Sequence, residues 1–387
     1  MRRNFILGVF LFVFLNACGG SDTDSNTSTT TEAAEDLLVV TTTQLEPMDQ
    51  TTTTTTTVEE VVVTIPTTTV DTSWEGPVYP LTGLPAYEGI PQAPAVAVKV
   101  GNNDEDSLPQ HGLREADIVY DIRVENGKSR FLAIYHSRLP ETVMPVRSAR
   151  SSDINLLLNL NHPVFVYWGS NDLVLEEIRA AEWRGGFDSR SAASRWGEEY
   201  FKRDSSRPRP DNGKINTQEL QGVASGEAET PMPIFEYGDI PQSAVPAAGA
   251  RWTIWQRVVD YVWDGSLQQW LRYQDGVPHL DETGSPLTAD NLLFLYIGYR
   301  LSDADPVSPQ AISTGSGDGW LLRDGTVTGV RWERQRTSDE WTLSDDETGE
   351  TVPLDVGTTW VTLARPGEGD ILSAEDVKEL VAENSNE

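Results

Sequence analysis

The sequence predicts a mixed α/β (α+β) fold, with a layered sheet-and-helix N-terminal domain followed by a β-rich C-terminal domain. Two observations lead to this prediction. Apolar, β-branched runs at 118–124 and 130–136 flank Glu125-Asn126-Gly127-Lys128, and Asn-Gly between two such runs is a strong hairpin signal. In the second half, Asp-Gly and Thr-Gly pairs separate short apolar runs, which is typical of antiparallel sheets or barrels. These pairs begin at Asp275, Thr283, Asp324 and Thr348.

Helical patterns follow the hairpin in the first half. Ser151-Ser152-Asp153 precedes an apolar run and predicts the N-terminal cap of a helix over 154–160. A short buried strand at 164–168 leads through Gly169-Ser170-Asn171-Asp172 into helical spacing at 173–182. This order of strand, turn and helix predicts a helix N-terminus at the turn, where backbone N–H groups can bind an anion.

The second half is predicted to consist mainly of strands. They are expected at 253–259, 268–273, 292–299, 319–322, 327–333, 340–343, 350–353 and 359–363. A short acidic helix is expected to begin at Ser373. A change of composition to Ala, Ser, Gly, Glu, Thr and Pro at 222–233 predicts a linker between the two halves.

These features divide the chain into five predicted parts. They are a signal peptide at 1–17, a disordered Thr-rich stalk at 18–73, an N-terminal α/β domain at 74–225, a β-rich C-terminal domain at 226–368 and an acidic tail at 369–387. The stalk contains the unbroken run Thr51 to Thr57 and neither Lys nor Arg. It can bury too little apolar surface to offset chain entropy, so we expect an extended tether.

The N-terminus resembles a bacterial lipoprotein signal. Two arginines precede an apolar run at 5–15, which is shorter than the roughly 20 residues of a membrane-spanning helix. The run ends in Leu15-Asn16-Ala17-Cys18, similar to a lipobox in which the Cys is lipidated and becomes the mature N-terminus. Cys18 is the one Cys of the chain, and lipidation would consume an otherwise unpaired exported thiol. The alternative is an ordinary signal peptide with a chance Cys.

Composition and motifs argue against several functions. The formal net charge of −31 argues against nucleic acid as a partner and against flat docking on anionic lipid. The four His residues lie far apart, no Ser stands in Gly-x-Ser-x-Gly, and no phosphate-binding glycine loop is present. We therefore expect no metal and no cofactor. The acidic run at 345–350 fits a hairpin turn better than a loose calcium site, because it lacks alternating ligand spacing.

The first half contains an unusual group of arginines. Arg147-Ser148-Ala149-Arg150 places two guanidinium groups three residues apart, just before a predicted helix. Arg forms rigid two-point contacts with carboxylate or phosphate, so this stretch predicts an anion site. Its candidate ligand-binding residues are Arg130, Arg147, Ser148, Arg150, Asn171 and Arg203. The alternative is internal pairing of these arginines with Asp117, Asp121, Glu125 or Asp153.

Several blocks of the sequence resemble the YerB family of bacterial lipoproteins. In the first half the blocks are Pro80 to Leu84, Gly112 to Tyr120, Ser129 to Ala133 and Pro145 to Arg150, and the last of these is the most specific. In the second half they are 273–281, 287–291, 315–317 and 357–360. The resemblance covers nearly all of residues 79–366. It implies a two-part, mixed α/β envelope lipoprotein with layered sheets and helices and no assigned reaction. Where the family usually has Pro-His-Asn, this chain has Pro210-Asp211-Asn212, and Asp211 and Asn212 complete the candidate site.

The sequence therefore predicts a non-enzymatic binding or scaffolding lipoprotein on the extracellular face of the cell membrane. Its membrane contact is the lipid on Cys18, and its expected partners are a cell-wall polymer or envelope assembly proteins. The alternative is an envelope hydrolase with acid and base among Asp121, Glu125, Asp153 and Asp211, since paired carboxylates are defined by space rather than by sequence. Whether any catalysis occurs stays open at this point.

Overall fold

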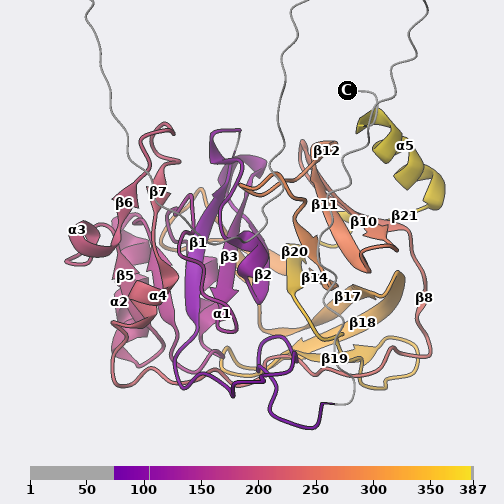
Figure 1. Cartoon of the computed structure of the whole chain (residues 1–387), viewed down its shortest axis with the longest axis horizontal. Coiled ribbons are helices and arrows are strands. Elements are labelled where there is room, and N and C mark those ends of the chain that lie inside the picture. Colours follow the sequence, from indigo (N-terminus) through magenta and orange to yellow (C-terminus); the bar gives the residue numbers. More distant parts are fainter. Residues whose placement is uncertain (1–73, 104, 385–387) are drawn as a thin grey trace, which may run out of the picture. The chain divides into compact units, whose positions relative to one another are not determined.

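The computed structural model of the chain describes residues 74–103 and 105–384. The predictions for the signal peptide, Cys18 and the Thr-rich stalk lie outside these residues. The described residues form an 11-stranded sheet, a 6-stranded sheet and two small two-stranded sheets, with helices beside them (Figure 1). The predicted mixed α/β class is confirmed, with helices and sheet in the first half and mostly strands in the second.

The 11-stranded sheet takes strands from both halves of the chain. Its order is β19-β18-β17-β14-β20-β2-β3-β1-β4-β5, and β8 pairs with β18. The first half supplies β1 Val96–Asn102, β2 Ile118–Arg123, β3 Ser129–Tyr135, β4 Val164–Tyr167 and β5 Asp188–Ser191. The second half supplies β8 Val245–Pro246, β14 Asn291–Tyr296, β17 Gly315–Arg323, β18 Thr326–Arg334, β19 Thr342–Asp345 and β20 Thr359–Ala364. Because β2 pairs in parallel with β20, the sheet is continuous across the two halves.

The 6-stranded sheet belongs to the second half. Its order is β12-β11-β10-β9-β21, and β13 pairs with β11. Its strands are β9 Gly249–Ile254, β10 Arg257–Asp264, β11 Gln269–Gln274, β12 Val277–Pro278, β13 Thr288–Ala289 and β21 Gly369–Leu372. The small sheets are β6 Lys202–Arg203 with β7 Gly213–Lys214, and β15 Gly298–Leu301 with β16 Pro309–Ile312.

The helices are short apart from two. They are α1 Ser151–Leu157, α2 Asp172–Trp183, α3 Gly197–Tyr200, α4 Thr217–Gln221 and α5 Ala374–Asn384, with 3-10 turns at 105–107, 113–115 and 125–127. Leu156 of α1 and Ile178 of α2 belong to one buried cluster together with Ala97 of β1. Val98 of β1 belongs to a second cluster with Trp252 of the 6-stranded sheet. Alternate residues of β1 thus face different cores, which explains its uninterrupted apolar sequence.

Three predicted Xaa-Gly turns adopt the left-handed backbone that they require. In the β2–β3 turn, Asn126 has φ 62° and Gly127 has φ 66°. The pair Asp275-Gly276 has φ 54° and 85°, and Asp324-Gly325 has φ 49° and 68°. Positive φ at both central positions is the type I′ geometry that matches the twist of a hairpin. The predicted hairpin over 118–136 is therefore confirmed.

Several predicted boundaries are wrong. The helix expected over 154–160 begins at Ser151, because the carboxylate of Asp153 accepts the Arg150 N–H at 2.8 Å inside the first turn. The strand expected over 253–259 is broken by Trp255, whose φ of 56° starts the turn between β9 and β10.

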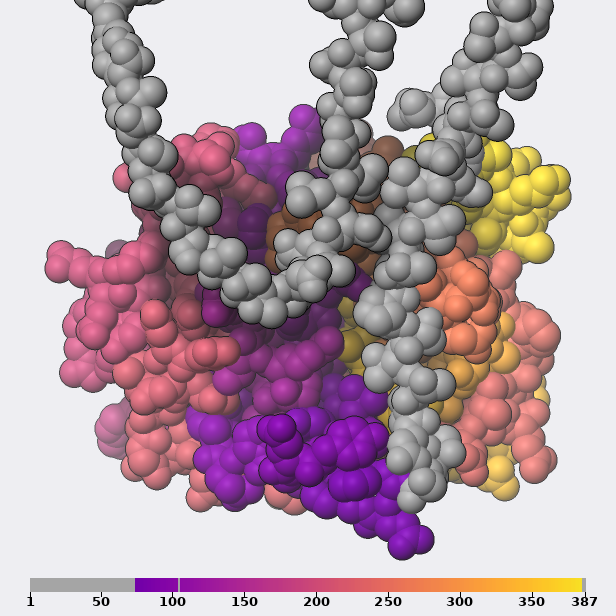
Figure 2. All heavy atoms as spheres, viewed as in Figure 1, coloured from indigo at the N-terminus to yellow at the C-terminus, as the bar shows by residue number. Residues whose placement is uncertain are grey.

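The two ends of the described chain both contact the sheets. The first four residues of the predicted acidic tail form β21, which pairs with β9. At the other end, the segment 74–94 lies along the lower edge of the face seen in Figure 2. The carbonyl oxygen of Thr82 accepts the N–H of Gly357 at 2.7 Å, so this segment is attached to the loop before β20.

Candidate functional site

The segment 145–150 lies between the carboxyl ends of the parallel strands β1 and β4 and begins antiparallel to β1. The Arg147 N–H donates to the carbonyl oxygen of Lys99 on β1 (2.8 Å), and the Trp168 N–H after β4 donates to that of Arg147 (3.0 Å). Open α/β sheets bind ligands outside the carboxyl ends of parallel strands. The most specific sequence block of the chain therefore lies where a sheet of this kind would present a ligand.

Arg150 and Glu125 form a two-point ion pair at this edge. Arg150 Nε lies 3.0 Å from Glu125 Oε2, and its Nη2 contacts Oε1. Burial acts to raise the pKa of Glu125, but the hydrogen bonds and charge of Arg150 outweigh it and lower this pKa to about 2. Glu125 is therefore ionised at neutral pH and binds the β2–β3 turn to the start of α1.

Arg130 of β3 lies beside this pair and is 5% exposed. Its Nη1 donates to the carbonyl oxygen of Ser148 (3.1 Å), and its Nη2 lies 3.5 Å from Oε1 of Glu125. Burial and the neighbouring charge of Arg150 lower the pKa of Arg130 to about 10, and Arg147 adds to the effect. Within the described residues, Arg130 has no carboxylate of its own and shares Glu125 with Arg150.

Arg147 pairs with Asp211, which precedes β7. Its Nη1 contacts Asp211 Oδ1, and this oxygen also accepts a hydrogen bond from Ser107 Oγ at 2.7 Å. Gly101 at the end of β1 makes room for the arginine, because a Cβ atom there would lie 2.7 Å from Arg147 Cγ. Asp211 is 4% exposed, so the position expected from the resemblance holds a buried ion pair.

A third ion pair lies beside these arginines and was not predicted from the sequence. Lys99 Nζ lies 2.7 Å from Asp153 Oδ1, and neither side chain is exposed to solvent. Asp153 Oδ2 accepts the Arg150 N–H, so the pair joins β1 to the first turn of α1. The sequence signals for this pair are a lone Lys in the apolar run at 95–100 and an acid in the predicted cap of the helix over 154–160.

The remaining candidate residues surround this cluster. Arg203 donates from Nη1 to Asn212 Oδ1 (2.6 Å), and its guanidinium group lies 4.3 Å from the ring centre of Trp168. Asn171 caps α2, because its Oδ1 accepts the Val174 N–H at 2.9 Å. Arg130, Arg147, Ser148, Arg150 and Asp211 therefore lie in one contact network, and Arg203, Asn212 and Asn171 lie next to it.

A loop from the second half contacts this network at Glu125 and at the start of α1. Ser308 Oγ donates to Glu125 Oε2 at 3.2 Å, and Ser302 Oγ lies 2.7 Å from Ser151 Oγ in α1. Ser151 Oγ also donates to Glu177 Oε2 of α2 at 2.6 Å. The loop 302–308 thus holds Glu125 and the first residue of α1 by hydroxyl contacts that no local sequence pattern indicates.

Each of the four carboxylates named for the hydrolase alternative forms an ion pair with a Lys or Arg side chain. Glu125 pairs with Arg150 and Asp211 with Arg147, and Asp153 and Asp121 are fully buried against Lys99 and Arg272. An acid–base pair for sugar hydrolysis needs one carboxylate that can be protonated and one that faces substrate. Among these four residues, Asp121 has a pKa raised by burial but is fully enclosed, and Glu125 is partly exposed but pairs with Arg150. Asp117, also named for internal pairing, instead accepts the N–H groups of His136 and Ser137.

Comparison with known proteins now identifies the family. Residues 81–230 match "Protein of unknown function (DUF3048) N-terminal domain", and residues 250–361 match "Protein of unknown function (DUF3048) C-terminal domain". The chain belongs to the DUF3048 family. The resemblance to the YerB family is confirmed. Neither description of a DUF3048 domain assigns an activity.

The DUF3048 chain is similar in sequence and in structure to a Bacillus protein. A Bacillus subtilis (strain 168) protein named "Putative lipoprotein YerB" is 28% identical over 296 residues, covering 73% of this chain and 85% of that protein. The crystal structure of YerB from Bacillus subtilis matches with a TM-score of 0.64 and 25% identity, covering 77% of this chain and all of that one. The solved YerB structure thus shares the greater part of the fold described above.

The described part of the DUF3048 chain shows neither a candidate metal group nor a membrane-spanning helix. Across residues 74–103 and 105–384, no group of three or more His, Cys, Asp and Glu side chains could hold a metal ion. In the same residues, no helix combines the length and apolar character needed to cross a bilayer. In the acidic run at 345–350, Asp345 Oδ1 accepts the N–H groups of Glu347 (2.9 Å) and Thr348 (2.7 Å), which is a self-contained turn.

The Arg150–Glu125 pair predicts a specific acid sensitivity. The pKa of Glu125 in the folded protein is about 2, below its ordinary value of 4.5. The stabilising effect of the ionised Glu125 carboxylate is therefore complete above pH 4.5. It is lost as the pH falls from about 4.5 towards about 2. Glu125→Gln should therefore lower the free energy of unfolding by up to about 2 kcal/mol at pH 6, discounted for partial exposure, and by progressively less at lower pH.

Urea unfolding of both proteins between pH 6 and pH 3 measures this difference. The matched control is Glu350→Gln, an exposed carboxylate in the turn after β19. It should follow the wild-type pH dependence. A constant gap between Glu125→Gln and wild type at every pH would show that Arg150 does not hold Glu125 ionised.

Proposed function

We propose that this chain is a lipid-anchored cell-envelope protein that binds an anionic ligand through Arg130, Arg147 and Arg150, here called the arginine cluster. The observation that supports it is an excess of buried positive charge. Among the described residues, these three guanidinium groups pair with two carboxylates, Glu125 and Asp211, in a protein whose net charge is −31. A ligand carboxylate or phosphate would supply the missing negative charge and accept two-point hydrogen bonds.

The surroundings of the arginine cluster are suited to such a ligand. The side chains of Arg147 and Arg150 keep 13% and 12% of their surface exposed, so their outer faces can be reached from solvent. The N-terminus of α2 begins just after β4, at the same edge of the sheet, and carries partial positive charge. Arg203, which donates to Asn212 next to Asp211, extends the polar surface around the cluster.

The proposed location rests on the N-terminal sequence and on the relative. Cys18 in a lipobox-like context and the Thr-rich stalk fit a lipid anchor and a tether on the extracellular face of the cell membrane. The similar Bacillus protein is itself named as a lipoprotein. A cell-wall polymer, or an acidic segment of an envelope assembly protein, is the partner that this location and the arginine cluster favour together.

Arg130→Gln is the variant that tests the arginine cluster most cleanly. It removes the surplus charge while leaving Glu125 paired with Arg150, so no carboxylate loses its partner. A charged hydrogen bond contributes about 1.5–3 kcal/mol. Affinity for an anionic polymer should therefore fall about tenfold or more. The free energy of unfolding should fall by about 1–3 kcal/mol, because the Ser148 carbonyl oxygen loses its donor. Calorimetric titration with a phosphodiester polymer and with a polycarboxylate measures this and separates the two anion types.

Arg130→Gln is a more specific test than replacing both Arg147 and Arg150 by Ala. Changing Arg147 and Arg150 to Ala would abolish binding, but it would also leave Asp211 and Glu125 without counter-charges and confuse binding with folding. Arg331→Gln is the matched control, because Arg331 lies on β18 with a half-exposed side chain. Unchanged affinity of folded Arg130→Gln for both polymers, or no binding by the wild type, would refute the proposed site.

A further inference from the structure

The turn between β9 and β10 holds a tryptophan at a position that favours glycine. Trp255 has a φ of 56°, and Gln256 completes this two-residue turn before β10 begins at Arg257. A positive φ at the first position of such a turn suits Gly, Asn or Asp, and it strains a bulky aromatic residue. Strained residues of this kind gather at binding and active sites. A tryptophan here therefore indicates a role outside folding.

The side chain of Trp255 is also left open to solvent. The residue is 73% exposed, so burial contributes little to keeping a tryptophan in this turn. By contrast, an arginine guanidinium group lies 4.3 Å from the ring centre of Trp168 and 4.8 Å from that of Trp341. In the part of the chain that the structure describes, no arginine and no aromatic ring stacks on Trp255 in this way. Its indole ring is therefore available to a ligand.

A contact with the β2–β3 turn places Trp255 beside the arginine cluster. A Cβ atom on Gly127 would lie only 2.7 Å from Trp255 Cε3, so the indole ring lies directly against this glycine. Glu125, two residues earlier in the same turn, pairs with Arg130 and Arg150. The β2–β3 turn therefore contacts the indole ring at one residue and two guanidinium groups of the cluster at another.

Arg257 holds the β9–β10 turn in this place from its other end. Its Nη1 donates to the carbonyl oxygen of Asn102 (2.9 Å), and its Nη2 donates to that of Asn103 (3.2 Å). The side-chain amide of Asn103 lies 3.4 Å from Nε of Arg130. Two independent contacts thus connect the β9–β10 turn with the residues that surround Arg130.

The groups around the indole ring are polar, which favours a sugar over a protein surface as the ligand. Gln256 and Asn126 are exposed, and Lys128 is half-buried beside Gly127. Tryptophans that anchor protein interfaces lie in well-packed pockets closed to water. A sugar ring instead has an apolar C–H face that can stack on an indole ring, and hydroxyl groups at its edge that can bond to polar neighbours. A single open ring with polar groups around it fits the sugar.

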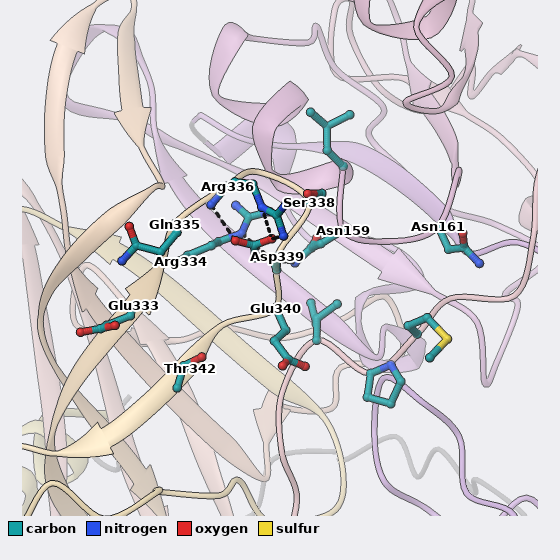
Figure 3. A pocket seen from close by; sticks show the side chains of 14 residues that line it. Asn159, Asn161, Glu333, Arg334, Gln335, Arg336, Ser338, Asp339, Glu340 and Thr342 are labelled. Carbon is teal, nitrogen blue, oxygen red and sulfur yellow. Dashed lines mark hydrogen bonds and ion pairs between the residues drawn. The ribbon is translucent and has the colours of Figure 1, made fainter.

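The pocket drawn in Figure 3 offers no comparable combination. It has a volume of about 690 Å³ and lies between the end of α1, the segment 232–234 and the loop that joins β18 to β19. Arg334 donates there to the carbonyl oxygens of Asn155 and Asp339, each at 3.0 Å. Arg336 pairs with the carboxylate of Asp339, as the dashed lines show. The residues that line this pocket thus provide neither a surplus guanidinium group nor a tryptophan.

We infer that Trp255 binds a sugar ring of the ligand whose anionic group binds to the arginine cluster, so that the ligand is an acidic carbohydrate. This inference rests on the function proposed above and narrows it to an anion carried by a sugar polymer. The anionic group is a phosphodiester or the carboxylate of a sugar acid, which accept the same two-point contact from arginine. An acidic protein segment, the other partner named for the cluster, lacks the sugar ring.

Calorimetric titration of the full chain with two matched polymer pairs tests this inference. One pair is a glycerol phosphate oligomer with and without glucose substituents. The other is an oligogalacturonate and an oligoglutamate with the same number of carboxylates. We expect at least one sugar-bearing polymer to bind about tenfold or more tightly than its sugar-free counterpart, and the pair that responds identifies the anion. Equal or tighter binding of both sugar-free polymers would overturn the inference and leave the anion site standing, whereas binding of none of the four would overturn both.

Trp255→Asn removes the indole ring without straining the turn, since Asn adopts a positive φ more readily. Binding of the preferred sugar polymer should fall about tenfold or more, to the level of its sugar-free counterpart. Binding of the sugar-free polymer should stay as in wild type, because the arginine cluster is unchanged, and the unfolding temperature should not fall. Trp255→Tyr keeps an aromatic ring and should retain part of the preference for sugar.

Trp183→Asn is the matched control. Trp183 is 88% exposed and is the last residue of α2, whereas the first turn of that helix lies at the edge with the arginine cluster. Its loss should leave all four affinities unchanged. Arg130→Gln should instead weaken both members of a pair equally, which separates the anion site from the sugar site. An unchanged preference for sugar in Trp255→Asn, or equal effects of the Trp183 and Trp255 variants, would overturn the inference.

Discussion

Replacing Arg272 by Met should lower the free energy of unfolding by about 3–5 kcal/mol, the cost of removing one partner from a buried ion pair. Arg272 lies on β11, and its Nη2 is 2.9 Å from Asp121 Oδ2 on β2. Their side chains are 1% and 0% exposed. The variant leaves the Asp121 carboxylate buried without a cation, between the two large sheets.

Arg272 also organises the polar groups around it. Its Nη1 contacts His279 Nδ1, so this nitrogen acts as an acceptor and the neutral imidazole donates from Nε2 to Gln110 Oε1 at 2.7 Å. Burial and the charge of Arg272 hold the pKa of His279 well below 6.5. The guanidinium group further lies 5.2 Å from the ring centres of Phe131 and Trp360. One side chain thus connects the two sheets by charge, hydrogen bonds and aromatic contact.

Urea unfolding of Arg272→Met at two pH values measures the effect. Burial already raises the pKa of Asp121, and loss of Arg272 should raise it further. The folded variant then binds a proton more readily than the unfolded chain, so the destabilisation should be smaller at pH 5 than at pH 8. The double variant Asp121→Leu with Arg272→Met should recover much of the loss, since apolar replacement of a whole buried pair is often neutral.

The control for Arg272→Met is Arg331→Met. Arg331 pairs with Asp318 at 3.5 Å, but the two side chains are 51% and 78% exposed. Exposed ion pairs contribute about 0–1 kcal/mol. Equal losses in the two variants would contradict a structural role of the Asp121–Arg272 pair.

Local features of this fold could be predicted from sequence because their causes are local. Asn126-Gly127 requires a left-handed backbone that few residues adopt, so it marked the β2–β3 turn and its flanking strands. The strand and helix on either side of the turn at 169–172 were likewise visible in the sequence. The boundary of α1 was missed because a tertiary pair, Lys99 with Asp153, holds its first turn.

Long-range features could not be predicted because no local pattern specifies a partner strand. The pairing of Ile118 with Thr359 joins residues far apart in the chain, and many apolar runs would have served equally well. The arginines were recognised from their number and spacing, but their carboxylate partners depend on the sheet order. Of the two open interpretations of the arginines, internal pairing describes Arg147 and Arg150, and the anion site stays a prediction.

Replacing Lys99 by Met should also lower the free energy of unfolding by about 3–5 kcal/mol. In this variant Asp153 stays buried but loses the Lys99 ammonium group. Of the two donors described above, the Arg150 N–H remains. Because the Lys99–Asp153 pair holds the first turn of α1, Arg150 should lose its fixed position over Glu125. Affinity for an anionic polymer should therefore fall together with stability, although Lys99 is fully buried and cannot touch the ligand.

Rescue separates this positioning role from a general loss of folding. In Lys99→Met with Asp153→Asn, no charge remains unpaired and the amide oxygen can still accept the Arg150 N–H. Stability and affinity should then both return towards wild type, as urea unfolding and calorimetric titration can show. Lys378→Met, at an exposed position of α5, is the control and should change neither quantity. If the rescued protein regains stability but not affinity, the Lys99 ammonium group itself attracts the anion; if Lys99→Met is as stable as wild type, the pair does not hold α1.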